Sequence, residues 1–329
     1  MLGSVYDADD ALQETLLRVW RGAAGLRDAA SARSWLYTIA TNVCLTELAR
    51  RKKRMLPIDL GPAAEPHTPP GEPLVESTWL EPYPDEALGL PSGRATPEAS
   101  YERHESVELA FVAALQHLGA NQRAALMLRD VLGFSAQEAA TMLETSVASV
   151  NSALQRARAA VRARVPRRSQ QENVQSLGDR GLRELIARYV DAWERCDVDA
   201  FAQLLVADAT FAMPPLRTWY TPRETITMWA RESSMSGRWG WRALLTRANA
   251  QPALAFYAWD APSGAYLPFA LNVLSLRDGL VSDVTAFIVR ATGAEEPDAY
   301  ERFPERPLDE RQARGAFGRF GLPERLEAA

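Results

Sequence analysis

The chain has 329 residues, enough for two or three domains that each bury a core. Its 47% apolar and 24% charged content is typical of a globular protein, and no apolar run approaches the roughly 20 residues that cross a bilayer. The acidic start, MLGSVYDADD, is unlike a secretory signal, so we expect a cytoplasmic protein. Two cysteines, Cys44 and Cys196, argue against a disulfide framework or a zinc site, and we expect no metal and no cofactor.

The net charge of −5 is unevenly distributed. Residues 50–54 (RRKKR) and residues 155–168 (QRARAAVRARVPRR) are dense basic blocks, and the segment between them is acidic. This segregation indicates two separate contacts with nucleic acid rather than a uniformly acidic enzyme.

Residues 1–54 form the first predicted domain, built from two helices with a loop between them at residues 22–32. Leu12, Leu16, Val19 and Trp20 recur at helical spacing on the first helix. Another side of that helix presents an acidic, partly apolar stripe that could dock on a basic partner; the alternative is a solvated acidic face. The stripe consists of Asp9, Asp10, Gln13, Glu14 and Leu17.

Residues 55–104 carry ten prolines, which forbid long helices and central strands. We therefore predict an acidic, extended and mobile linker.

Residues 105–168 predict a helix-turn-helix. Gly133 ends one helix, Ser135 and Glu138 form a capping box for the next, and Thr145 or Ser146 caps the last. The outer face of this last helix offers donors suited to base edges and phosphates; the alternative is a helical hairpin with a solvated arginine-rich face. That face consists of Ser149, Asn151, Ser152, Gln155, Arg156 and Arg158.

A polar stretch at residues 170–178 marks the next predicted boundary, and residues 180–292 predict an α+β domain followed by a charged tail at 293–329. Helices are expected at 182–195 and 199–206. Five segments with strand character follow, and Asp278-Gly279 between two apolar runs predicts a hairpin.

This domain contains apolar side chains that could line a pocket for a small apolar ligand, although most must also form ordinary core. They are Phe211, Met213, Trp219, Tyr220, Trp229, Trp241, Phe269 and Phe287. Proton transfer by Asp191, Asp208, Tyr189, Tyr220 or Arg247 is conceivable. However, His67, His104 and His117 all lie outside the domain and no paired carboxylates or metal-ligand spacing is visible, so we expect no catalytic residues and no enzyme.

The paired helical segments resemble the extracytoplasmic-function (ECF) group of the sigma-70 family. DADDALQETLLRVW resembles its polymerase-binding helix, RSWLYTIATNVCLTELARRKKR its helix for the downstream promoter element, and residues 130–164 its reader of the upstream element. The resemblance implies core RNA polymerase and promoter DNA as partners. It further implies that Asn42 and the basic residues Arg50, Arg51, Lys52, Lys53 and Arg54 contact the melted downstream element, and that residues 25–34 help to capture an unstacked base.

The family usually has another helix before the polymerase-binding helix, whereas this sequence begins almost at DADD. Either the sequence starts too late, or the first domain lacks a packing helix, in which case we expect the apolar face of residues 12–20 to be less covered.

Residues 180–292 resemble the SnoaL-like and ketosteroid-isomerase-like family, a curved sheet wrapped by helices around a conical pocket. We therefore expect helical sigma domains followed by this α+β domain, in an alternative sigma factor regulated by its C-terminal extension. Two other functions remain open: a helix-turn-helix regulator with an effector pocket, and an isomerase-like enzyme fused to a DNA-binding remnant.

Overall fold

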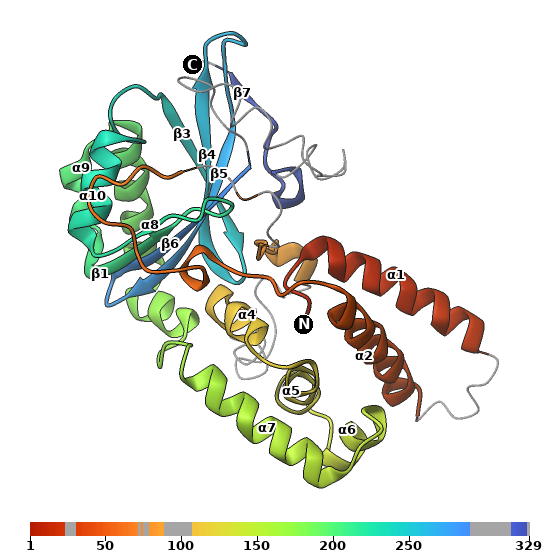
Figure 1. Cartoon of the computed structure of the whole chain (residues 1–329). Coiled ribbons are helices and arrows are strands. Elements are labelled where there is room, and N and C mark those ends of the chain that lie inside the picture. Colours follow the sequence, from red (N-terminus) through yellow and green to blue (C-terminus); the bar gives the residue numbers. More distant parts are fainter. Residues whose placement is uncertain (24–30, 72–73, 75–78, 89–106, 290–316, 328–329) are drawn as a thin grey trace. The chain divides into compact units, whose positions relative to one another are not determined.

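The computed structural model describes residues 1–23, 31–71, 74, 79–88, 107–289 and 317–327 (Figure 1). The chain divides into two compact units. The first combines Met1–Met55 with Pro91–Arg167, and the second combines Leu56–Leu90 with Arg168–Ala329. Within the described residues, no helix is long and apolar enough to cross a membrane.

The first unit opens with α1 (Val5–Gly22), which Ser4 caps by accepting a hydrogen bond from the Asp7 amide, and continues with α2 (Ala32–Arg50). The buried face of α1 is made of small residues such as Ala11 and Thr15, because α2 approaches on that side. The larger apolar side chains point outward: Leu12 is 56% exposed, Leu16 54% and Trp20 79%.

The second half of this unit contains α4 (Leu109–Gln116), α5 (Ala120–Leu126), the π-turn η5 (Met127–Val131), α6 (Ala136–Met142) and α7 (Val147–Arg162). The predicted helix-turn-helix is present as α6 and α7. Gly133 has a φ of +71° and ends the preceding helix, and Ser135 with Glu138 forms the capping box of α6. Of the two candidates for the α7 cap, Ser146 fills the position.

The helices of the second unit are α8 (Gln170–Glu194), α9 (Val198–Ala202) and α10 (Arg223–Glu232). The helix predicted to start at residue 182 starts earlier, within the polar stretch 170–178 that the sequence suggested as a boundary. Ser169 and Glu172 form a capping box there, and the helix kinks at Gly178 instead of starting after it. The helix predicted at 199–206 is also too long, since the apolar residues from Leu205 onward begin the first strand.

The strands form one mixed sheet in the order β2-β1-β6-β5-β4-β3, with β7 added to β5. Their bounds are Leu205–Ala212 (β1), Trp219–Tyr220 (β2), Trp241–Ala248 (β3), Gln251–Asp260 (β4), Ala265–Arg277 (β5), Leu280–Ile288 (β6) and Leu326–Glu327 (β7). β1 runs parallel to β6, and the other pairs are antiparallel. Asp278 and Gly279 adopt positive φ angles in the tight turn between β5 and β6, which confirms the predicted hairpin.

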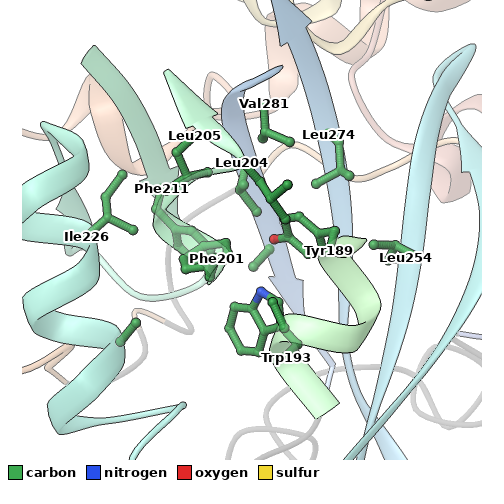
Figure 2. Packing of buried hydrophobic residues seen from close by; sticks show 14 of the residues in the cluster. Tyr189, Trp193, Phe201, Leu204, Leu205, Phe211, Ile226, Leu254, Leu274 and Val281 are labelled. Atoms are coloured by element: carbon green, nitrogen blue, oxygen red, sulfur yellow. The ribbon is translucent and has the colours of Figure 1, made fainter. Parts of the chain in front are cut away.

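Helices α8, α9 and α10 cover one face of this sheet (Figure 1). An aromatic core fills the space between them: Tyr189 and Trp193 of α8 lie against Phe201, Phe211 and Leu254 (Figure 2). A β-bulge at Phe269, opposite Phe256 and Tyr257, disturbs the β4–β5 register and bends the sheet. The predicted fold class, helical domains followed by an α+β domain, is confirmed.

The linker differs from the mobile tether that its prolines predicted, because its described parts pack on the C-terminal domain. Residues 61–71, hereafter the strap, run beside β2, where the Ala64 amide donates to the Trp219 carbonyl at 2.8 Å and the Trp219 indole donates to the Gly61 carbonyl at 3.0 Å. Short turns flank the strap at η3 (Pro57–Asp59) and η4 (Asp85–Leu88). Proline removes the linker's own backbone donors, so side chains and carbonyls make many of these contacts.

Candidate nucleic-acid interface and apolar cavity

The outer face of α7 is exposed at each of the six positions proposed to contact DNA: Ser149, Asn151, Ser152, Gln155, Arg156 and Arg158. The opposite face, with Val150, Leu154 and Ala157, is buried in the unit's core. The helical period therefore fixes which side chains can reach a groove, and it places the amide side chains of Asn151 and Gln155 one turn apart on the exposed side.

Arg158 is held differently from its neighbours on this face. Its guanidinium donates to both carboxylate oxygens of Asp130, at 2.7 and 2.8 Å, and this hydrogen bond raises the pKa of Arg158 above its ordinary value. Arg156, by contrast, donates to the hydroxyl of Ser152 one turn earlier. Arg158 thus joins α7 to the end of η5, whereas Arg156 stays on the outer face.

The basic segment at residues 50–54 also separates into two roles. Arg51 and Arg54 both pair with Asp7 of α1, and the side chains of Arg54 and Asp7 are only 11% and 6% exposed. Arg50 and Lys52 are exposed, while the Lys53 ammonium lies 2.8 Å from the His117 ring nitrogen Nδ1. Sequence reasoning treated all five as DNA contacts and missed Asp7, whose partners are more than 40 positions away.

The start of α2 contacts the helix-turn-helix half of the same unit. Arg33 donates to the Leu132 carbonyl at 2.7 Å and its guanidinium lies 4.4 Å from the centre of the Phe134 ring, while Tyr37 packs edge-on against that ring. Of the proposed base-capturing residues 25–34, residues 25–30 lie outside the described residues, and Ser34 belongs to the first turn of α2. Asn42 is half-buried in the middle of α2.

The five residues proposed to bind polymerase occupy one helix, but with unequal exposure. Asp10, Gln13 and Leu17 are exposed, whereas Asp9 and Glu14 are half-buried, and Glu14 pairs with Arg18 at 2.7 Å. The exposed Leu12, Leu16 and Trp20 extend the same helix surface with apolar groups. The surface that α1 offers to a partner is therefore more apolar than the acidic stripe alone.

The C-terminal domain contains a cavity of about 120 Å³ between the helices and the concave side of the sheet. Five residues of the predicted set line it: Phe211, Met213, Trp229, Trp241 and Phe269. The bulge in β5 accounts for Phe269, which the regular alternation of the strand would turn to the other face.

Trp219, Tyr220 and Phe287 do not line the cavity. Phe287 lies between Ala286 and Ile288, which do line it, and so points to the opposite face of β6. Trp219 and Tyr220 instead hold the strap: the Tyr220 hydroxyl donates to the Thr68 carbonyl at 2.8 Å. Among the lining residues that sequence reasoning missed are Pro70, Trp193, Trp239 and Asn272. The RWGW run was the one signal available for Trp239.

The residues considered for proton transfer are engaged elsewhere. Asp191 pairs with Arg195 on the exposed side of α8, and Asp208 pairs with Arg277, which lowers the pKa of Asp208. Arg247 pairs with Asp85 of the linker. Burial raises the pKa of Tyr189 far above its ordinary value, so its phenol stays protonated. None of these residues lines the cavity.

Comparison with known proteins matches two segments of the first unit to family models. The chain matches the family models "Sigma-70 region 2" over residues 1–54 and "Sigma-70, region 4" over residues 108–161. These two matches cover α1 with α2, and α4 to α7. They define the class of protein as one built on the two promoter-recognition regions of sigma-70.

Relatives that align beyond these two regions identify the group within the sigma-70 family. The ECF RNA polymerase sigma factor SigG of Mycobacterium tuberculosis is 41% identical over 293 residues, which cover 88% of this chain and 76% of SigG. SigJ of the same organism is 29% identical over 212 residues, 64% of this chain and 58% of SigJ. The crystal structure of M. tuberculosis SigJ superposes with a TM-score of 0.52 at 21% identity, covering 93% of each chain, so the two share a fold.

The chain belongs to the ECF RNA polymerase sigma factors, which direct transcription initiation. Both relatives named above are sigma factors of this group. Proteins of this kind bind core RNA polymerase and promoter DNA, and both basic faces described above lie within the two matched regions.

Proposed function

We propose that α7 reads the upstream promoter element through Asn151, Ser152, Gln155 and Arg156, with Ser149 at its start. The exposure of this face and its place in the region 4 match support the assignment. Arg158 has the separate task of bracing α7 against Asp130, so a phosphate contact by Arg158 would require that ion pair to open.

For the downstream element, we propose that Asn42, Arg50, Lys52 and Lys53 make the direct contacts. Arg51 and Arg54 orient the segment by their pairing with Asp7 and contribute positive charge rather than hydrogen bonds to bases. α1 docks on the polymerase through Asp10, Gln13 and Leu17, with Asp9 and Glu14 at the edge of that surface. Because polymerase and DNA meet in the cytoplasm, we propose that the chain acts there.

The experiment that tests the reading helix is transcription by core polymerase from a library with a randomised upstream element. Wild-type protein should enrich one upstream sequence. Gln155→Ala or Asn151→Ala should relax the preference at one or two positions by about 5- to 100-fold, because a bidentate base contact is worth roughly 1–3 kcal/mol. Arg180→Ala, an exposed residue of α8, is the control. Failure of the wild type to enrich any sequence would refute the assignment.

The polymerase surface is tested separately by binding to core enzyme in the absence of DNA. Leu17→Ala and Asp10→Ala should each weaken binding, whereas Arg162→Ala at the end of α7 should not. Unchanged binding in both α1 variants would show that the polymerase-binding surface does not lie on this face of α1.

We also propose that the C-terminal domain regulates the sigma regions by holding the linker between them. Six of the hydrogen bonds that support this come from β2 and from the β3–β4 turn. Tyr83 and Asn249 are joined by two hydrogen bonds, both of 2.9 Å. The Asn249 backbone amide donates to the Tyr83 carbonyl, and the Tyr83 backbone amide donates to the side-chain oxygen Oδ1 of Asn249. Asp85 accepts from the Ala250 amide at 2.7 Å and pairs with Arg247.

The physical consequence is a shortened tether. A segment held on the domain cannot extend, whereas the 28 residues at 61–88 would span up to about 100 Å if they were released. A held linker thus restrains how far the two regions can separate on DNA. A small apolar ligand in the cavity is the signal that this arrangement could sense.

A further inference from the structure

We propose that the cavity of the C-terminal domain binds a compact, uncharged, mainly apolar molecule carrying one hydrogen-bond-accepting oxygen, and that this binding holds the strap in place. The inference rests on the proposed regulatory role of the linker and specifies the chemistry that would control it.

The cavity walls argue against a charged ligand. The described residues that line it include no acidic or basic side chain, and most are aromatic, such as Trp193, Trp229, Trp241 and Phe256. A carboxylate or ammonium placed here would lose its hydration without gaining a counter-charge. The lining also offers no general base, so the site suits binding without turnover.

Four polar atoms of the lining indicate what the ligand must carry. The indole Nε1 atoms of Trp193 and Trp229, the Ser234 hydroxyl and Asn272 Oδ1 are buried and have no hydrogen-bond partner among the described residues. The indoles are donors only and the hydroxyl can donate, so a ligand oxygen that accepts would satisfy a donor of this set; only Asn272 Oδ1 would need a donor instead. Buried polar groups of this kind usually find a partner, and their lack of one is a reason to expect a ligand.

The volume limits the size. An apolar cavity of about 150 Å³ accepts a benzene-sized molecule. The volume of about 120 Å³ found here is of the same order, so the cavity suits a molecule built on a single six-membered ring with at most a small substituent.

The strap is connected to the cavity at two points. Pro70 lines the cavity, and its carbonyl accepts a hydrogen bond from the Thr218 hydroxyl at 2.5 Å. Trp229 stacks on Tyr220 with ring centres 5.1 Å apart, and the Tyr220 hydroxyl donates to the strap at Thr68. Suppose that the ligand binds only while Pro70 closes the cavity. Ligand binding and the held position of the strap are then coupled, and each stabilises the other by the same free energy.

The test uses the full chain, without polymerase or DNA, and three probes: acetophenone, ethylbenzene of similar shape without the oxygen, and charged benzoate. Calorimetry should give acetophenone an affinity about 2- to 12-fold higher than that of ethylbenzene, the range of one net hydrogen bond. Benzoate should not bind. Saturating acetophenone should also slow hydrogen exchange at the Ala64 amide, which donates to β2.

Variants assign these effects to the cavity. Trp229→Phe keeps an aromatic ring and removes the indole N–H, so the preference for acetophenone over ethylbenzene should vanish. If that variant fails to fold, Ala286→Leu, which fills the cavity, should abolish binding of both probes. Trp259→Phe, on an exposed indole outside the cavity, is the matched control and should bind like the wild type.

Equal affinity for acetophenone and ethylbenzene, absence of saturable binding, a preference that survives Trp229→Phe, or unchanged exchange at Ala64 would each overturn the inference. The regulatory role of the linker is measured by transcription and can survive such a failure, so the two proposals are separable.

Discussion

Asp7 is the residue on which the basic segment depends. Its carboxylate accepts hydrogen bonds from Arg54 at 2.6 and 3.1 Å and pairs with Arg51, inside the first unit. An aspartate buried between two arginines stabilises the fold only while the partners remain, because the desolvated charges compensate one another.

Asp7→Asn should therefore lower the free energy of unfolding of the first unit by roughly 2–4 kcal/mol. Urea denaturation followed by circular dichroism measures this change. Glu14→Gln removes an ion pair of the same helix whose partners are more than 40% exposed, and it should cost less than about 0.5 kcal/mol. Equal effects of the two substitutions would show that Asp7 is not a buried anchor.

Glu138 provides a pH-dependent test of the helix-turn-helix. Hydrogen bonds from the Ser135 hydroxyl and amide lower the pKa of Glu138 below its ordinary value of 4.5. Because the folded-state pKa is depressed, the cap's contribution to stability is present above pH 4.5 and is lost as the pH falls through the folded value. An NMR titration should find a pKa below 4.5 in the wild type and a higher one in Ser135→Ala. The same pKa in both proteins would contradict the capping geometry.

At the scale of elements, removing a single side-chain oxygen should weaken the contact between the strap and β2. Tyr220→Phe removes the hydroxyl that donates to Thr68 and leaves the buried ring in place, so exchange at the Ala64 amide should rise about 2- to 12-fold.

Tyr257 offers a matched control. Its side chain is as buried as that of Tyr220, and its ring packs edge-on against Phe317. Its hydroxyl donates at 2.8 Å to the Pro323 carbonyl in the C-terminal segment. Tyr257→Phe should accelerate exchange near Pro323 and leave Ala64 unchanged. Acceleration at Ala64 in both variants would mean general loosening of the domain rather than release of the strap.

Elements with local signals could be predicted from the sequence. The capping box at Ser135 and Glu138, the Asp278-Gly279 turn and the period of α7 each depend on neighbours within a few positions, so the helix-turn-helix and the β5–β6 hairpin were assigned correctly. Ser169 and Glu172 carry the same capping pattern, but the polar composition of residues 170–178 concealed the start of α8.

Contacts between distant segments could not be predicted. Proline content suggested a free linker, yet what holds the linker is a set of carbonyls and side chains opposite β2 and the β3–β4 turn. Similarly, Arg247 resembled a pocket residue until its partner proved to be Asp85 of the linker. Pairing at a separation of 148 to 165 positions leaves no periodic trace in either segment.

At the scale of the whole molecule, the described linker segments connect the C-terminal domain to the proposed control of promoter recognition. Regions 2 and 4 are joined by a tether, and part of that tether belongs to the compact unit of the C-terminal domain. In the regulation proposed above, no enzymatic step is required, and the number of linker residues that the domain retains would set the distance over which the two regions can work together.

The most direct measurement is promoter-specific transcription by core polymerase with the full-length double variant Tyr220→Phe/Arg247→Ala, in which both the strap and the Asp85 contact are weakened. Tyr257→Phe serves as the control, and hydrogen exchange at Ala64 verifies release. Because a longer free tether relieves the restraint, transcript yield should rise about 3- to 10-fold over the wild type, a change that corresponds to roughly 0.7–1.4 kcal/mol. Yield that stays the same or falls, with the strap shown to be released, would contradict the account.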